Sequence, residues 1–132
     1  MGKFRIYLDD VRTPHSPNNE WIYGIEEWTV VRSYDEFVDK VKEVGLENIE
    51  VISLDHDLGD TAMKEYYSNV SPNYKLDYNN IHEKTGYDCA RHLVSECTAK
   101  GVKHPPYVVH SMNPVGKLNI ESYINSYNKT IV

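Results

Sequence analysis

The stretch VISLDHDLG, residues 51–59, decides how this chain folds. It begins as an apolar run rich in β-branched residues, which is typical of a strand buried in a sheet. It then changes abruptly to aspartate, histidine, aspartate, leucine and glycine. In an open α/β sheet, ligands bind beyond the carboxyl ends of the strands. We therefore expect this strand to carry functional side chains at its end.

Two further stretches have the same form. Residues 4–8 (FRIYL) run into two aspartates, and the strand expected at 107–110, which opens with YVV, ends in a histidine that a serine follows. Because the carboxyl ends of parallel strands meet at one edge of a sheet, we expect these three strand ends to converge. A functional site built from all three is the main prediction from the sequence.

Helical patterns alternate with these strands. After another expected strand, residues 27–32, the sequence SYDE at 33–36 has the form of a capping box, and apolar residues recur at helical spacing until Gly45. Two more helices are expected, over 85–101 and over 118–127. Alternating strands and helices predict parallel pairing with right-handed crossovers, and hence an α/β sheet of about four strands.

Residues 60–84 interrupt the alternation. This segment is polar, rich in tyrosine and without clear periodicity, so we expect it to be an irregular insertion in a single domain formed by residues 1–132. Because it starts directly after Gly59, it is a candidate lid over the site. The alternative is an ordinary insertion that contains one short helix.

Charge and composition exclude some classes of function. The net charge of -6 argues against non-specific binding to duplex DNA, which needs a basic surface. Cys89 and Cys97 lie in one expected helix, roughly 12 Å apart along its axis, which is too far for a disulfide. With no recognisable signal peptide and no apolar run long enough to cross a bilayer, the sequence predicts a cytoplasmic protein without membrane contact.

The aspartates at the strand ends are candidate metal ligands. Asp9 and Asp10 on their own are compatible with a solvated turn, but Asp55 ends a neighbouring buried strand. Carboxylates brought close together repel one another unless a cation joins them. Hard oxygen ligands are suited to Mg²⁺ or Mn²⁺, which also bind phosphate oxygens. We expect these three aspartates to hold one such divalent cation.

Histidines at the strand ends are candidate catalysts. A single histidine in such a place is most often structural, but His56 and His110 each lie next to an oxygen-bearing side chain. Imidazole titrates near neutral pH, so the pair can take a proton from water and give one to a leaving alkoxide. We expect these two histidines, together with Asp55, to be catalytic.

Four more residues are candidates for holding a substrate phosphate: Arg12, Asp57, Ser111 and Asn113. An arginine binds phosphate oxygens in a bidentate manner, although Arg12 has Asp10 and Glu20 as alternative partners. Asn113 precedes a proline, so it is also a candidate helix cap.

Taken together, the motifs resemble the cyclic-phosphate processing receiver family. The resemblance rests on four stretches that occur in order: LDDVRTP (8–14), SLDHDLG (53–59), TGYD (85–88) and HSMNPVG (110–116). It implies a receiver-like, flavodoxin-like fold with a doubly wound parallel sheet. It also implies that Asp9 and Asp10 are the metal-binding acidic pair of a receiver, Asp55 its phosphoacceptor and Ser111 its small hydroxyl residue.

The sequence departs from signalling receivers in three respects. No fifth strand ending in Lys-Pro is recognisable, the segment after the first strand contains prolines and leaves the usual first helix in doubt, and the two histidines are additional. We therefore expect a metal-dependent phosphoesterase that acts on cyclic phosphates at RNA ends or on cyclic nucleotides. The alternatives are a module that binds a cyclic nucleotide without cleaving it, and a signalling receiver phosphorylated on Asp55.

Overall fold

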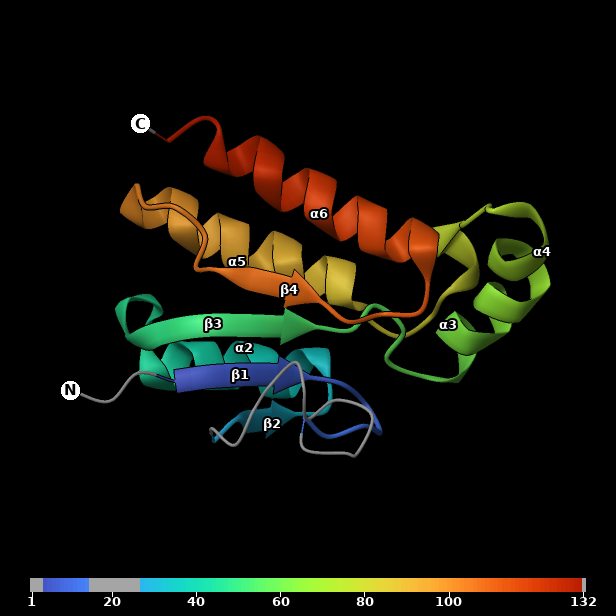
Figure 1. Cartoon of the computed structure of the whole chain (residues 1–132), viewed down its shortest axis with the longest axis horizontal. Helices are drawn as coiled ribbons and strands as arrows, with labels where there is room; N and C mark the ends of the chain where they lie inside the picture. Colours follow the sequence, from blue (N-terminus) through green and yellow to red (C-terminus); the bar gives the residue numbers. More distant parts are fainter. Residues whose placement is uncertain (1–3, 15–26, 132) are drawn as a thin grey trace.

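The computed structural model describes residues 4–14 and 27–131 (Figure 1). Its strands are β1 (Phe4–Leu8), β2 (Thr29–Val31), β3 (Ile49–Leu54) and β4 (Tyr107–Val109). All pairings are parallel, and the strand order is β2-β1-β3-β4. The predicted parallel α/β sheet of four strands is confirmed. The direction of strand succession reverses between β1 and β3, and this reversal creates a crevice for ligands at their carboxyl ends.

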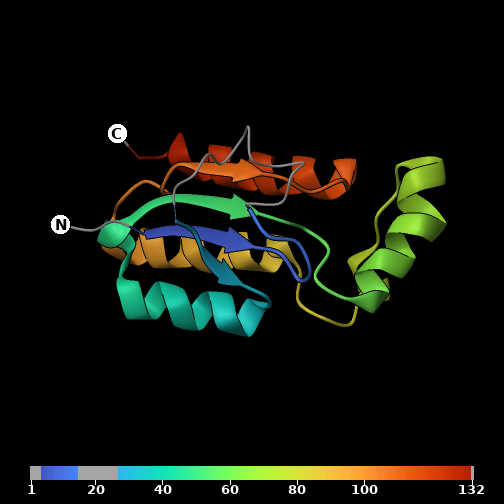
Figure 2. The same cartoon turned by 60° about the horizontal axis from the view of Figure 1, so that its bottom comes forward.

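The three long helices are α2 (Tyr34–Val44), α5 (Gly86–Lys100) and α6 (Pro114–Asn128). Helices α2 and α5 lie side by side against one face of the sheet, and α6 packs beside α5 at the edge formed by β4 (Figure 2). Apolar side chains from these helices and from the strands form one continuous core. The helix that usually follows the first strand would fall in 15–26, outside the described residues. No strand follows α6 within the described residues.

Local signals explain where the helices begin and end. Ser33 caps α2 by accepting a hydrogen bond from the Glu36 N–H, and Gly45 ends it with a φ of 85°. Thr85 caps α5 in a complete capping box with Asp88. Helix α6 begins at Pro114, earlier than expected, because the Asn113 side chain accepts from the Gly116 N–H at 2.9 Å.

The insertion is more regular than expected. It forms α3 (Asp60–Glu65), a π-helical segment (Tyr66–Val70) and α4 (Ser71–Asn73), followed by a 3₁₀ turn (Tyr78–Asn80). This continuous helical stretch lies beyond the carboxyl ends of the strands (Figure 1). The expectation of an irregular loop was therefore wrong. The reason is that polar contacts, rather than an apolar stripe, hold much of the segment in place.

A buried glutamate organises this insertion. Glu65 is 4% exposed, and its carboxylate accepts hydrogen bonds from the Asn69 and Asn80 side-chain amides and from the Asp77 N–H, each at 2.9 Å. Together they hold its pKa below the usual range although burial opposes this. Glu83 similarly accepts from the Ala62 N–H. A hydrophobic pattern cannot reveal a segment that is held in this way.

Candidate metal and phosphate site

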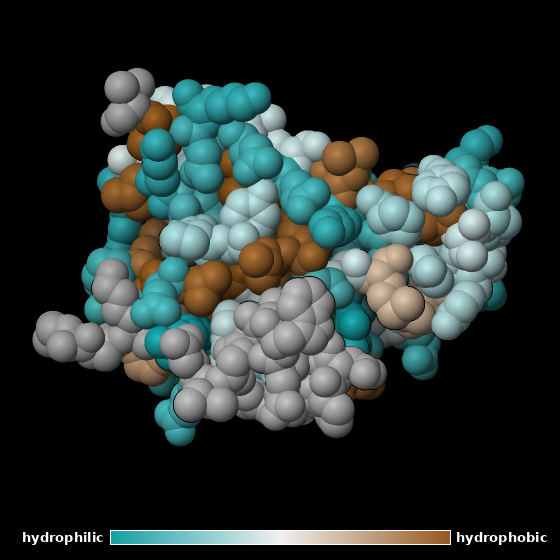
Figure 3. Space-filling model, in the orientation of Figure 1, coloured by the Kyte–Doolittle hydropathy of each residue, from teal (hydrophilic) through white to brown (hydrophobic). Residues whose placement is uncertain are grey.

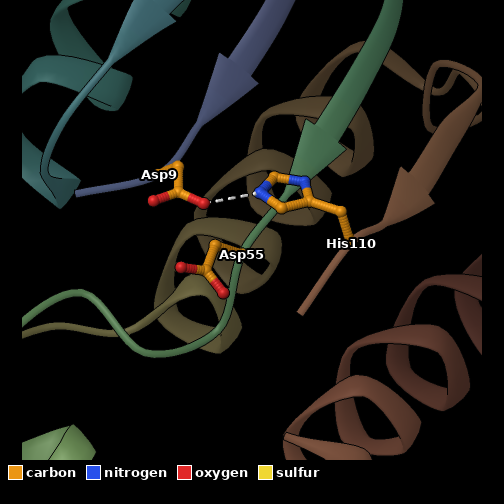
Figure 4. A group of neighbouring side chains, drawn as sticks. All are labelled: Asp9, Asp55 and His110. Atoms are coloured by element: carbon orange, nitrogen blue, oxygen red, sulfur yellow. Dashed lines mark hydrogen bonds and ion pairs between the residues drawn. The ribbon is translucent and has the colours of Figure 1, made fainter. Parts of the chain in front are cut away.

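The sheet itself fixes the first three functional residues. The Asp9 N–H donates to the Val31 carbonyl, the Asp55 N–H to Leu8 and the His110 N–H to Leu54, at 3.1, 3.0 and 2.9 Å. These bonds extend the parallel ladder by one residue beyond β1, β3 and β4. Asp9, Asp55 and His110 therefore follow one another along one edge of the sheet, and their side chains converge (Figure 4). We call them the strand-end cluster.

The strand-end cluster has the dimensions of a metal site. One ligand atom from each of its three residues lies within 4.8 Å of the others. Asp9 is fully buried, Asp55 is 6% exposed, and the His110 side chain is 9% exposed. The convergence expected for Asp9 and Asp55 is therefore present. The third member of this group is His110; Asp10, the other expected ligand, is not part of it, and its role as a ligand stays a prediction.

The Asp9 carboxylate is saturated with donors. One oxygen accepts from the Val11 and Arg12 N–H groups at 2.9 and 2.8 Å, and the other accepts from Arg12 Nε at 2.8 Å and from His110 Nε2 at 3.0 Å. Burial alone would raise the pKa of Asp9, but these bonds outweigh it and hold the pKa far below the usual range. Asp9 is therefore ionised across the physiological range.

Asp55 has the opposite electrostatics. Burial and the nearby charge of Asp9 raise its pKa to about 7, although Arg12 and the His56 N–H oppose the shift. An Arg12 Nη2 atom lies 3.5 Å from Asp55 Oδ1, so Arg12 spans both carboxylates. Arg12 thus places a positive charge beside both aspartates. Because it leaves Asp55 only partly compensated, the site favours an additional positive charge.

His110 is held between the sheet and Asp9. Its ring stacks on Tyr7 with centroids 4.4 Å apart, its Nδ1 lies 2.7 Å from Ser53 Oγ, and its Nε2–H donates to Asp9. Burial lowers the pKa of His110, and the hydrogen bond to Asp9 opposes this only in part. The ring is therefore neutral near pH 7. Since a hydroxyl both donates and accepts, Ser53 can support either tautomer, including the one with a metal-binding lone pair on Nε2.

His56 has a different environment. It is fully buried, its Nδ1–H donates to Asp57 at 2.7 Å, and its Nε2 accepts from the Tyr78 hydroxyl at 3.0 Å. Asn113 donates its amide to the same Asp57 oxygen at 3.2 Å. The result is a hydrogen-bonded chain from the insertion to the loop after β3. Both ring nitrogens of His56 are occupied by this chain. The Asn113 side chain is also engaged, because its amide donates to Asp57 and its oxygen caps α6.

A cavity of about 340 Å³ opens over the carboxyl ends of the strands. Its polar wall consists of Asp9, Asp10, Arg12, Asp55, Asp57 and Ser111. Ser111 also accepts from the Asn113 N–H at 3.0 Å. Burial and the charge of Asp9 raise the pKa of Asp10. The residues described as lining this cavity include no histidine, so the geometry does not place either expected catalytic ring at its surface.

Several important residues had no distinctive sequence signal. Ser53 looks like an ordinary strand residue, and Tyr78 and Glu65 lie in a polar segment without a motif. Arg32 donates to the Asp9 and Arg12 carbonyls at 3.1 and 2.6 Å, and so fixes the loop after β1. Only alternation along β3, which points Ser53 to the same side as residue 55, offered a hint.

The profile of the cyclic-phosphate processing receiver domain matches residues 4–126, which include every residue of the strand-end cluster. The chain belongs to the cyclic-phosphate processing receiver family. Comparison with curated proteins and with solved structures gave no match. The chain has the receiver-like parallel sheet, and the residues of its strand-end cluster lie close enough together to hold a metal ion.

A close approach of the backbone at Gly86 explains why a glycine stands in the TGYD stretch. Gly86 of the TGYD stretch donates its N–H to the His56 carbonyl, and a Cβ there would lie 1.8 Å from the Asp55 carbonyl oxygen. Helix α5 can therefore begin directly behind the loop after β3 only if this residue is glycine. In the described part of the chain, no helix is long and apolar enough to cross a membrane.

Proposed function

We propose that this protein hydrolyses cyclic phosphate esters with a divalent cation, Mg²⁺ or Mn²⁺, held by the strand-end cluster. The observation that carries the proposal is the pair of buried carboxylates, Asp9 and Asp55, which approach each other and His110 within 4.8 Å at the floor of a cavity. Two carboxylates and an imidazole suit a divalent cation. The raised pKa of Asp55 supports the need for one.

The cation, when bound, neutralises the phosphate and makes an attacking water more acidic. Arg12 then has a second task. It pairs with Asp9 and Asp55 in this structure, and its side chain is 36% exposed on the wall of the cavity. If a cation were held by the two carboxylates, the Arg12 guanidinium would no longer be needed to neutralise them and could hold two phosphate oxygens. Ser111 offers a hydroxyl on the same wall.

Asp10 is the proton donor in this proposal. It lines the cavity, and burial together with the charge of Asp9 raises its pKa, so a protonated fraction persists at higher pH than usual. As water adds to phosphorus and the ring P–O bond breaks, Asp10 gives its proton to the leaving oxygen. The product is a phosphate monoester, and the proton lost by water passes to solvent.

The proton-transfer roles expected for His56 and His110 remain predictions, and the contacts favour other roles. We assign His110 the role of third ligand, because Ser53 orients its ring. His56 is placed as the connector between Asp57 and Tyr78. Asn113 and Asp57 belong to the same connection, so we assign to them the shape of the site rather than direct phosphate binding.

The test is a panel of 2′,3′- and 3′,5′-cyclic nucleotides and RNAs with cyclic-phosphate ends, incubated with and without Mg²⁺ or Mn²⁺ and analysed by mass spectrometry. We expect cation-dependent ring opening that Asp9→Asn and Asp55→Asn abolish and that Arg12→Ala impairs through a higher KM. Asp39→Asn is the matched control, because Asp39 lies on the exposed side of α2, and it should behave as wild type.

Two outcomes would replace the proposal. Tight binding of a cyclic phosphate without ring opening would make the protein a binding module. A labile phosphoryl adduct after treatment with acetyl phosphate, present in the wild type and absent from Asp55→Asn, would make it a signalling receiver.

A further inference from the structure

The cavity over the strand ends has a second, chemically different wall. Its remaining lining residues are apolar or aromatic: Val11, Met63, Tyr66, Tyr67 and Met112. Three of these side chains are largely exposed, with fractions of 76% for Val11, 68% for Tyr67 and 76% for Met112. The described residues include eight exposed large hydrophobics, and three of them gather at this one opening.

The insertion presents the aromatic part of this wall in a fixed position. Tyr66 and Tyr67 begin the π-helical segment, and their rings make an edge contact with centroids 5.2 Å apart. Single turns of π-helix occur frequently at functional sites. In Figure 3 the insertion forms a lobe of mostly pale surface with a tan, more apolar patch, which matches its content of tyrosine and methionine.

Polar contacts on both flanks make this wall rigid. Glu65 directly precedes the two tyrosines and is fixed by its three hydrogen bonds, and the Thr61 hydroxyl and Ala62 N–H bind Glu83. A surface that is ordered before binding loses little conformational entropy when a ligand arrives. The exposed Tyr67 ring is therefore suited to receive a flat ligand.

The size of the cavity limits what the two walls can hold together. Its 340 Å³ lies near the lower end of ligand pockets, which run from about 300 to 1,000 Å³, so the cavity itself has room for about one nucleotide. A nucleotide has the same division as the cavity, with a charged phosphate at one end and an aromatic base at the other. Aromatic side chains stack on bases of any sequence.

We propose that Tyr67 and Met112 hold the nucleobase of a nucleoside cyclic phosphate, either free or at the end of an RNA, while Arg12 and the strand-end cluster hold its phosphate. This inference rests on the proposed function and specifies its substrate class. Met63 and Tyr66 form the back of the base site. The insertion is thus the element that makes the enzyme select nucleotides over cyclic phosphates that carry no base.

The test compares ligands that share the phosphate and differ in the base. Calorimetry would measure binding of a nucleoside 2′,3′-cyclic phosphate and of methyl riboside 2′,3′-cyclic phosphate, which has no base, with Ca²⁺ present and over times too short for turnover. We expect Tyr67→Ala to weaken nucleoside binding by roughly 5- to 150-fold, the usual contribution of one stacked base, and to leave the baseless ligand unchanged. Tyr67→Phe should restore binding.

Tyr74→Ala is the matched control, because Tyr74 is 71% exposed on the same insertion and does not line the cavity. Equal affinity of the wild type for both ligands would overturn the base site and leave the proposed hydrolysis standing. Base-dependent binding without turnover would sustain the base site and overturn the hydrolysis. A short RNA with the same cyclic end identifies the source: comparable affinity supports the one-nucleotide cavity, and affinity more than tenfold higher overturns it.

Discussion

Asp55 is the residue on which the electrostatics of the site depend. Two carboxylates at adjacent strand ends cannot both ionise freely in a buried place, and the donors are divided unequally between them. Asp9 accepts four hydrogen bonds, whereas Asp55 accepts from the His56 N–H and lies 3.5 Å from Arg12. Asp9 therefore keeps its charge, and Asp55 becomes the group whose protonation responds to pH and to a cation.

Metal binding should therefore depend on pH through Asp55. Its pKa rises from 3.8 to about 7, so below neutral pH a cation must displace a proton. We expect Mn²⁺ affinity, measured by titration calorimetry, to fall about tenfold for each pH unit below 7 and to level off above it. Asp55→Asn should weaken binding and remove this slope. An unchanged slope in Asp55→Asn would show that another group carries the proton.

At the scale of single residues, the sequence predicted which strand-end side chains come together but not the hydrogen bonds that hold them. The alternation of apolar strands and polar ends placed Asp9, Asp55 and His110 together, because parallel strands end at one edge. It did not reveal that His56 turns away, since neighbouring residues in a loop have no fixed side-chain direction. The partner that holds it, Tyr78, lies 22 residues further along the chain.

Helix α6 lies outside the floor of the site but contacts the His56 ring, and through this contact it affects the shape of the site. Helix α6 approaches so closely at Gly116 that a Cβ there would lie 2.4 Å from the His56 ring. The ring is fully buried and hydrogen-bonded at both nitrogens, so it has no room to move. The glycine therefore sets how near the cap at Asn113 comes to Asp57.

Gly116→Ala should accordingly destabilise the fold by about 1–3 kcal/mol, the usual scale of overpacking in a well-packed core. Chemical denaturation measures the loss. Gly101→Ala is the control, since a Cβ there meets nothing within 4 Å and only the φ of 67° is unfavourable. In the double variant with His56→Ala, the two losses should be less than additive, because removing the ring removes the clash. Strict additivity would place the strain elsewhere.

The insertion marks the limit of sequence patterns at the scale of elements. Helices α2 and α5 were predictable because caps and apolar stripes coincide. In residues 60–73 the helical conformation is held instead by the buried Glu65 and its amide partners. Ala62 and Val70 are the fully buried apolar side chains of this segment. A carboxylate that organises a helix looks, in a sequence, like any charged surface residue.

At the scale of the whole molecule, two buried groups oppose each other as pH changes. His104 precedes β4 and is 4% exposed; burial lowers its pKa from 6.5 to about 4, although the Pro105 carbonyl accepts its Nδ1–H. The folded protein therefore resists a proton that the unfolded chain accepts, and stability is lost as pH falls from 6.5 to 4. Asp55 acts with the opposite sign, because its raised pKa costs stability as pH rises from 3.8 to about 7.

Replacing His104 should change how the free energy of unfolding depends on pH. In His104→Phe one of the terms that fall with acid disappears, so the free energy of unfolding should decrease less, or increase more, than in the wild type as pH decreases from 6.5 towards 4; the contribution of His110, whose pKa burial also lowers, is the same in both proteins. The change in slope should reach about 1.4 kcal/mol per pH unit, the value for one proton. Urea denaturation across this range measures it. His82→Phe, at an exposed position, is the control and should follow the wild-type curve. If His104→Phe also followed it, His104 would bind its proton equally well in the folded protein and in the unfolded chain, and burial would not lower its pKa.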